Sequence, residues 1–315
     1  MLSRNEIILA KIESTYGSDS SPTGSDAIAV ANLIQANPAE NARFSERPVI
    51  RGGSIGKAAP LFGGSLFGIT FDVEVKGAGS LGVAPEWGVL LRSCGFAETV
   101  VAVTSVEYEP TSTFGANSSC TIYYWQDGVR YRLTGCRGNV QFKGTVGEVM
   151  ILTFTMVGRK TSGDPTDVSL PTPTLDSTTP PVFMAANFLS LDAYNPAFTE
   201  LTLDMGNEVT PGANANSANG YGEIRIGARD VRGTIDPEMT LVATQDWLGD
   251  WEDGVTQNLS ATLGTAGGNR ITISVPRCRY IEPAFDDRDG IRVITMGFKA
   301  EESTSLNDEV SILLD

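Results

Sequence analysis

Three glycines in residues 76–82, KGAGSLG, match the G-x-G-x-x-G spacing of dinucleotide-binding loops. Gly77, Gly79 and Gly82 lie between an alternating stretch and a short predicted helix, and Glu98 follows at about the distance where such loops place a ribose-binding carboxylate. A dinucleotide-binding strand is a buried apolar run, however, whereas the stretch before these glycines alternates polar and apolar residues. The pattern therefore favours a glycine-rich loop, with a nucleotide-binding enzyme that uses GAGSLG as an alternative.

Other candidates for a reactive or ligand-binding centre are incomplete. Residues 53–57, GSIGK, lack the spacing of a phosphate loop and its final Ser or Thr, and the acidic residues at 286–289 do not follow the register of a calcium loop. The chain contains no histidine, the commonest general base and a frequent zinc ligand. Its four cysteines form no CxxC pair and are expected to be free thiols: Cys94, Cys120, Cys136 and Cys278. We therefore expect no enzyme, no cofactor and no metal site.

The chain is acidic and long enough for about two domains of ordinary size. Its 315 residues include 23 Lys and Arg against 38 Asp and Glu, a net charge of −15. Such a surface does not favour DNA or anionic membranes, which bind through basic patches. The first residues lack the apolar core of a secretory signal, and no segment approaches the roughly 20 apolar residues of a membrane span. We expect a soluble protein made in the cytoplasm.

Alternating stretches supply the main structural signal. Residues 65–76, SLFGITFDVEVK, alternate apolar and polar side chains, which is the period of an antiparallel strand with one buried face. Residues 231–241 repeat the pattern, and tryptophans follow both stretches: Trp87 the first, Trp247 and Trp251 the second. We predict a short helix at residues 85–95 and a hairpin around Asp127-Gly128.

Several residues recur in the same order in both halves of the chain. One set recurs at a shift of 164 and a Cys-Arg pair recurs 142 residues later: Asp72, Glu74 and Trp87 match Asp236, Glu238 and Trp251, and Cys136-Arg137 matches Cys278-Arg279. This order predicts duplication of one β domain. We expect a mainly β protein with two tandem antiparallel β-sandwich or barrel domains, each with a short flanking helix, and an extended amino-terminal arm.

Composition sets the predicted boundaries. Residues 1–60 are predicted as the arm and a loop, because residues 14–30 are too rich in Ser, Gly, Asp and Pro to bury a core alone. The first domain is predicted at 61–165, a Pro- and Thr-rich linker at 166–181, and the second domain at 182–315. Residues 41–64 are expected to be a loop, and residues 207–222 a polar hairpin tip that projects into solvent or toward a neighbour.

The opening stretch carries a family resemblance. Residues 13–30, ESTYGSDSSPTGSDAIAV, combine Glu, Thr-Tyr-Gly, Pro and an Asp-Ala-Ile step. They resemble the amino-terminal arm of the tail tube proteins, or major tail proteins, of long-tailed bacteriophages, and the β set with one helix resembles the tube fold of that family. The resemblance implies that the arm contacts other subunits or rings through this stretch, with these candidates: Glu13, Tyr16, Gly17, Pro22, Ile28 and Val30.

The resemblance also implies a function. It implies a structural virion protein, made in the host bacterial cytoplasm, that self-assembles into stacked rings for DNA ejection. The second copy implies trimeric, pseudo-hexameric rings; the implied partners are the tape measure, tail terminator and tail-tip or baseplate proteins. DNA would be a non-specific passenger along an acidic lumen, for which the polar faces of the repeated strands offer candidates: Asp72, Glu74, Asp236 and Glu238. Another phage β-sandwich structural or decoration protein is the alternative.

Overall fold

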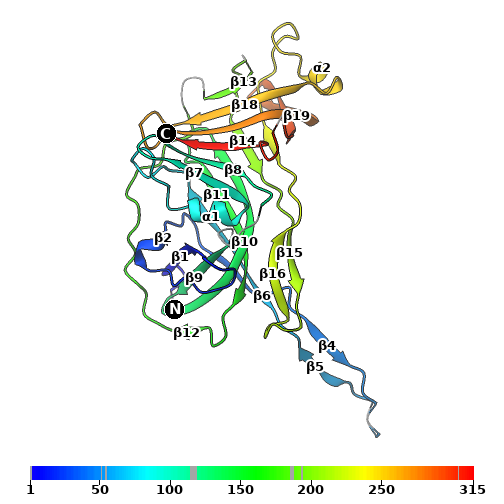
Figure 1. Ribbon diagram of the computed structural model, residues 1–315. Helices are drawn as coiled ribbons and strands as arrows, with labels where there is room; N and C mark the ends of the chain where they lie inside the picture. Colours follow the sequence, from blue (N-terminus) through cyan, green and yellow to red (C-terminus); the bar gives the residue numbers. More distant parts are fainter. Residues whose placement is uncertain are drawn as a thin grey trace.

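The computed structural model is mainly antiparallel β (Figure 1), which confirms the predicted fold class. It describes residues 2–50, 52–53, 55–113, 119–184, 188–192, 194–303 and 305–315. Within these residues the helices are two short α-helices, α1 (Gly88–Ser93) and α2 (Trp247–Glu252), and a 3-10 turn, η1 (Gly24–Asp26). Helix α1 is shorter than the helix predicted at residues 85–95.

Six strands of the first half pair in the order β1, β9, β10, β11, β6, β3. Strand β6 is the alternating stretch, and its apolar side chains Ile69, Phe71 and Val73 are buried in the core. The bounds are β1 (Glu6–Ile12), β3 (Gln35–Glu40), β6 (Leu66–Glu74), β9 (Cys120–Gln126), β10 (Val129–Thr145) and β11 (Ile151–Lys160). Smaller strands are β2 (Ala27–Ile28), β7 (Phe96–Val101), β8 (Ser105–Pro110) and β12 (Thr166–Asp167).

Six strands of the second half pair in the order β13, β18, β19, β20, β17, β14. The bounds are β13 (Leu189–Leu191), β14 (Glu200–Asp204), β17 (Arg232–Ile235), β18 (Thr256–Leu263), β19 (Ile271–Arg288) and β20 (Ile291–Ala300). The last strand, β21 (Ser311–Leu314), pairs with β19 and with β8.

The two halves share one strand topology. In chain order, β1, β3, β6, α1, β9, β10 and β11 correspond to β13, β14, β17, α2, β18, β19 and β20, and each set pairs in the same spatial order. The first half adds the hairpin β7–β8 between its helix and β9. A repeated topology of this kind is typical of internal duplication.

Both halves contain a β-bulge at the same place, which aligns their sequences residue by residue. Between Leu133 and Cys136, β10 has two residues opposite one residue of β9, and between Val275 and Cys278, β19 has two residues opposite one of β18. The bulges end at Cys136 and Cys278, which lie 142 residues apart, as the repeated Cys-Arg pair suggested. A bulge bends its strand, so β10 and β19 can each pair with different neighbours at their two ends.

The two halves are joined edge to edge. The carboxyl-terminal end of β10 pairs with β14 over five residues, from Gln141 opposite Asp204 to Thr145 opposite Glu200, and β21 pairs with β8. One cluster of buried side chains contains residues of both halves, from Ile8 to Leu314. Residues 168–181 form no helix or strand and run along the first half (Figure 1). The predicted boundaries at 61–165, 166–181 and 182–315 stay a prediction.

Each half carries an extra two-stranded hairpin at the same place in its topology. In the first half β4 (Phe44–Arg47) and β5 (Ala58–Phe62) lie between β3 and β6, and the hairpin projects from the body (Figure 1). In the second half β15 (Val209–Ala213) and β16 (Tyr221–Ile226) lie between β14 and β17. The loop predicted at residues 41–64 therefore contains a hairpin. The polar tip predicted at residues 207–222 packs on the first half, because its Tyr221 and the neighbouring Ile224 are buried against Leu66.

The tryptophans have different environments. Trp87 and Trp247 are 0% and 2% exposed, whereas Trp251 is 39% exposed. The Trp87 Nε1 donates a hydrogen bond of 2.9 Å to the Lys76 carbonyl, and the Trp247 ring packs against Tyr194 and Tyr280. Trp247 is therefore the spatial counterpart of Trp87, and the sequence match with Trp251 is wrong by one turn of α2.

Replacing these two tryptophans will separate a core role from a surface role. We expect Trp247→Ala to lower the free energy of unfolding by about 3–5 kcal/mol, because it leaves a large cavity between the sheet and α2. Trp251→Ala on the same helix should cost at most about 1 kcal/mol. Urea unfolding of both variants checks this, and equal losses would contradict the assigned core position of Trp247.

Candidate assembly surfaces

The stretch 13–30, which carries the predicted contact residues of the arm, begins with a buried carboxylate. Glu13 is 0% exposed, and its two carboxylate oxygens accept four hydrogen bonds. Oε1 accepts from the Thr121 hydroxyl at 2.9 Å and the Gly135 amide at 2.7 Å, and Oε2 accepts from the Gly17 amide at 2.6 Å and the Ser119 hydroxyl at 2.8 Å. Gly135 belongs to the shared bulge, so Glu13 fastens the amino-terminal segment to the bend of β10. A buried charge is tolerated where it is fully hydrogen-bonded in this way.

Tyr16 connects the same bulge with the second half. Its hydroxyl donates to the Gly135 carbonyl at 3.2 Å and accepts from the Ile224 amide of β16 at 2.7 Å. The guanidinium groups of Arg137 and Arg159 lie 5.0 and 5.1 Å from the centre of its ring, within cation–π range. Burial raises the pKa of the Tyr16 hydroxyl, although the two arginines act in the opposite direction. The Thr-Tyr-Gly step is thus an internal junction.

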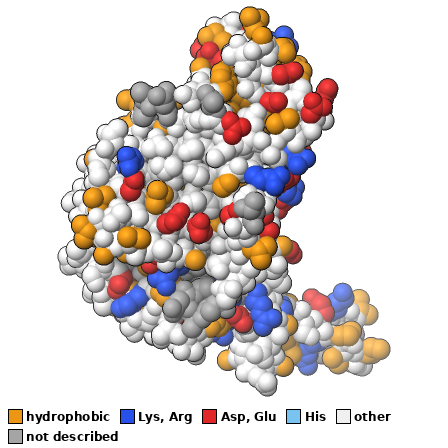
Figure 2. Space-filling view, turned by 45° about the horizontal axis from the view of Figure 1, so that its top comes forward, with side chains coloured by type: hydrophobic (Ala, Val, Ile, Leu, Met, Phe, Trp, Pro, Cys, Tyr) orange, Lys and Arg blue, Asp and Glu red, His pale blue; other side chains and the backbone are white. Residues whose placement is uncertain are grey.

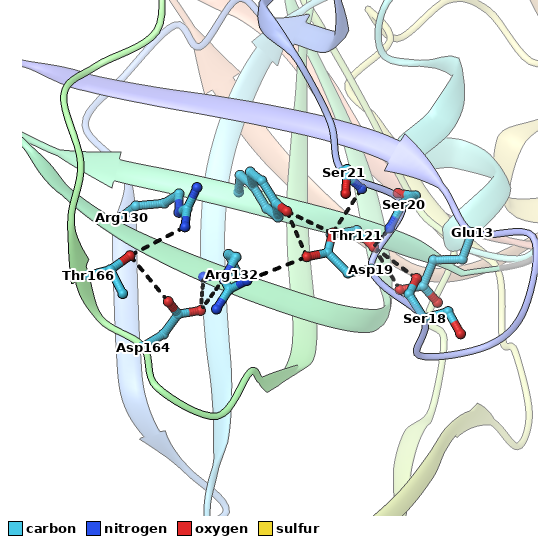
Figure 3. Close-up of polar contacts among 11 residues, drawn as sticks. Glu13, Ser18, Asp19, Ser20, Ser21, Thr121, Arg130, Arg132, Asp164 and Thr166 are labelled. Carbon is cyan, nitrogen blue, oxygen red and sulfur yellow. Dashed lines mark hydrogen bonds and ion pairs between the residues drawn. The ribbon is translucent and has the colours of Figure 1, made fainter.

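The polar residues after Tyr16 bind the outer face of β9 and β10 (Figure 3). The Tyr123 hydroxyl donates to both carboxylate oxygens of Asp19, at 2.8 and 2.7 Å, and Arg132 lies 3.8 Å from the same carboxylate. Arg132 also donates to Asp164 at 2.8 Å. This network, which we call the Asp19 network (Asp19, Tyr123, Arg132 and Asp164), connects the amino-terminal segment and the turn between β11 and β12 to strands β9 and β10.

The remaining arm candidates also lie on the chain's own surface. Pro22 and Ile28 are buried, Ile28 pairs with Ile8 of β1, and Val30 bridges to Val73 of β6. The structure thus brings Glu13, Tyr16 and Gly17 together and packs all six candidates on the first half. Their predicted contacts with other subunits stay a prediction.

The four acidic candidates for a lumen divide into two kinds. Asp72 and Glu74 lie half-buried on the polar face of β6, where Asp72 accepts from Asn32 at 2.7 Å and from Thr153 at 2.6 Å. Asp236 lies just past β17, accepts from the amides of residues 199 and 200, and binds Arg288 at 2.7 Å. Glu238 lies 3.4 Å from the same arginine. Arg288 therefore compensates the charge of the second pair.

The glycine-rich loop serves packing between the halves. The Gly77 amide donates to the Asn269 side chain at 2.7 Å, and the Gly79 amide donates to the Gly268 carbonyl at 3.1 Å. A Cβ at Gly77 would lie 2.1 Å from the Gly268 carbonyl oxygen, so no side chain fits there. The glycines admit a second-half loop, which explains their spacing without a nucleotide.

A comparison with protein families decides what these features belong to. The family model described as phage tail tube protein matches residues 3–300, which span both halves and both hairpins. The chain belongs to the phage tail tube family. A comparison with curated proteins gave no match. The recognition that rested on residues 13–30 is confirmed, and the chain has the structural role of a tail tube component.

The described part of this tail tube protein was compared with the requirements of a metal site, a membrane span and a reactive thiol. Within it, no three Cys, Asp or Glu side chains gather to hold a metal ion, and no helix is long and apolar enough to cross a membrane. The four cysteines are free and buried. Burial raises the pKa of the Cys94 and Cys136 thiols, and that of Cys278 to about 12, so these groups are poor nucleophiles.

The projecting hairpin β4–β5 of the tail tube protein is a surface that the sequence analysis missed. Apolar and basic side chains gather on it (Figure 2). Its exposed apolar side chains include Ile50 at 97%, Ile55 at 108% and Phe62 at 64%. Exposed apolar patches of this kind mark interaction surfaces. The signal available in the sequence was two apolar groups on either side of the glycines at 52–53, but no alternation marked them as strands.

Glu13→Gln tests the junction at the bulge. Either orientation of the Gln side chain turns its amide group toward a backbone N–H, of Gly17 or of Gly135, so the free energy of unfolding should fall by about 1–3 kcal/mol. Glu148→Gln is the matched control at an exposed position, with an expected change below about 0.5 kcal/mol. Equal stabilities of the two variants in urea unfolding would show that the buried contacts of Glu13 contribute nothing.

Proposed function

We propose that this tail tube protein self-assembles into trimeric rings that stack into the conduit for DNA ejection. The observation that carries the proposal is the edge-to-edge joint between β10 and β14. It joins two units of the same topology inside one chain, and repeating such a joint between chains extends the sheet. Closed cyclic symmetry is the usual way to satisfy sheet edges in a homo-oligomer. Three chains of two units each form a pseudo-sixfold ring.

The polar face of the extended sheet is the proposed lumen. In one row across it, Asp72, Thr153, Gln141 and Asp204 lie opposite one another on β6, β11, β10 and β14. Carboxylate, hydroxyl and amide groups do not hold duplex DNA, which binds through cationic side chains. Asp72 and Glu74 are the lumen candidates we retain, whereas Asp236 and Glu238 share the cation of Arg288.

The proposed rings need partners at several places. The projecting hairpin β4–β5 offers an apolar and basic surface for other subunits, and the segment 13–30 reinforces the ring from outside. By family membership, the tape measure, tail terminator and tail-tip or baseplate proteins are proposed partners in the virion tail. DNA remains a non-specific passenger.

Electron microscopy of the purified, concentrated protein tests ring formation. We expect three-subunit rings and hollow tubes, with a trimer as the smallest assembly in native mass spectrometry. A variant in which residues 48–57 are replaced by Gly-Gly loses the apolar hairpin tip and should form fewer rings than the full chain at the same concentration. Discrete monomers of the full chain at high concentration would refute self-assembly and favour a decoration protein.

Cysteine labelling of assembled tubes tests the lumen. Asp72→Cys and Glu74→Cys should react with a small maleimide but not with a bulky polyethylene-glycol maleimide, because the bulky reagent reaches the lumen only through the tube ends. Ser25→Cys, on the exposed turn η1 of the segment that we place outside the ring, is the outer control and should react with both. Equal reaction of Asp72→Cys with both reagents in intact tubes would exclude a lumen position.

A further inference from the structure

The strand edges that form the joint between β10 and β14 have equivalents elsewhere in the chain, and these equivalents are unpaired in the part of the chain that the structure describes. Eight strands follow one another as β3, β6, β11, β10, β14, β17, β20 and β19. Strands β3 and β19 are the two ends of this series. Within the described residues, no strand pairs with the outer edge of β3 or with the outer edge of residues 283–288 of β19.

The repeat identifies which residues of these two edges correspond to the joint. Strand β19 has a second bulge, at residues 282–283, so beyond it the offset from β10 is 143, and Phe142 corresponds to Phe285. The residue of β3 that corresponds to a given residue of β14 follows from rows of directly paired residues. In the first half one row crosses β10, β11, β6 and β3, and in the second half the equivalent row crosses β19, β20, β17 and β14. Their members correspond in this order: Gly138, Met156, Ile69 and Ala36 to Tyr280, Phe298, Gly233 and Leu203. Since Phe142 pairs with Leu203, the counterpart pair is Phe285 with Ala36.

The exposure of the residues agrees with a missing neighbour. Phe142 and Leu203 are each 2% exposed at the existing joint, whereas Phe285 is 51% exposed and Ala36 is also exposed. Pro38 corresponds to Met205, whose amide donates to the Val140 carbonyl of β10 at 3.2 Å, just beyond the last paired residue of β14. Pro38 lacks an N–H, so this one hydrogen bond of the existing joint has no counterpart at the edge of β3, and the ladder there ends before the proline.

Charge and shape agree as well. A hollow of about 590 Å³ borders the start of β3 and is lined by Arg4, Glu6 and residues 30–35. In the counterpart pairing, Asp286 lies opposite Gln35 and Asp287 opposite Ile34, which places an acidic strand end near Arg4. The Glu6 carboxylate in this hollow already accepts from Tyr124 at 2.8 Å and from the Ile34 amide at 3.1 Å.

The hairpin that follows β3 has a counterpart surface on the second half. Hairpin β15–β16 lies over Arg137, which is 2% exposed and donates to the Ile224 carbonyl at 2.6 Å. The corresponding Arg279 has a side chain that is 42% exposed, and it pairs with Glu301 at 2.8 Å. A copy that pairs through β3 would bring β4–β5 over Arg279, with apolar side chains to cover Trp251 and Val255, which are 39% and 40% exposed.

We propose that β3 of one copy adds antiparallel to residues 284–288 of β19 in a second copy, with Ala36 opposite Phe285, and that β4–β5 then lies on that copy's second half. Each of the two edges is thus paired with another molecule of this chain. In that contact β3, β4 and β5 of one copy take the positions relative to the second copy that β14, β15 and β16 take relative to the first half within one chain. The inference rests on the proposed ring assembly and specifies its interface.

A cysteine pair tests the register. The double variant Ala36→Cys, Phe285→Cys should form covalent dimers and trimers on mild oxidation, because antiparallel partners lie about 4.5–5.5 Å apart at Cα, within disulfide range. The two sites lie about 30 Å apart within one chain, across seven strand spacings, so any such bond is intermolecular. The native cysteines are buried and give little background. Non-reducing electrophoresis reads out the products.

The matched control moves one cysteine along β3. Ala39→Cys with Phe285→Cys displaces the thiol by about 10 Å, and its cross-linking should fall at least tenfold. Two results would overturn the proposed interface while leaving ring assembly intact. The first is that Ala36→Cys, Phe285→Cys forms rings in the microscope but no cross-linked trimers; the second is that the two double variants cross-link equally. If the wild-type protein stays monomeric under the same conditions, both ring assembly and the proposed interface are refuted.

Discussion

Backbone pairing between β10 and β14 is the constraint on which this structure depends. The pairing is possible only because β10 bends at the bulge before Cys136, so that its first part pairs with β9 and its last part with β14. The buried core then continues through both halves. A sheet edge left unpaired invites association, and within the chain this edge is satisfied by the other half.

The bulge also explains the amino-terminal segment. A bulge leaves backbone groups outside the ladder, and at this site the Gly135 amide and carbonyl are bound by Glu13 and Tyr16. Tyr16 further accepts from Ile224 of the second half. A segment too polar to fold alone therefore becomes ordered by supplying the hydrogen bonds that the bend lacks.

The two hairpins show how equivalent segments acquire different surroundings. Hairpin β15–β16 buries Tyr221 and Ile224 on its own chain, whereas β4–β5 exposes Phe62 and Ile55. The difference follows from the strand that precedes each hairpin, because the hairpin extends toward the half, first or second, with which the outer edge of that strand pairs. For β15–β16 that half is in the same chain; for β4–β5 it is, under our proposal, in another copy.

The sequence by itself determined the fold class, the alternation of β6, the Cys-Arg repeat and the family, because these depend on local periods and short motifs. It did not determine that Trp247 and not Trp251 fills the core, that residues 41–64 form a projecting hairpin, or that Glu13 and Tyr16 serve contacts within the chain. Those outcomes depend on contacts outside the local sequence pattern, such as that of Tyr280 with Trp247, and those of Thr121 and Gly135, more than 100 residues away, with Glu13. Only the tertiary structure, which brings distant strands to one bulge, decides them.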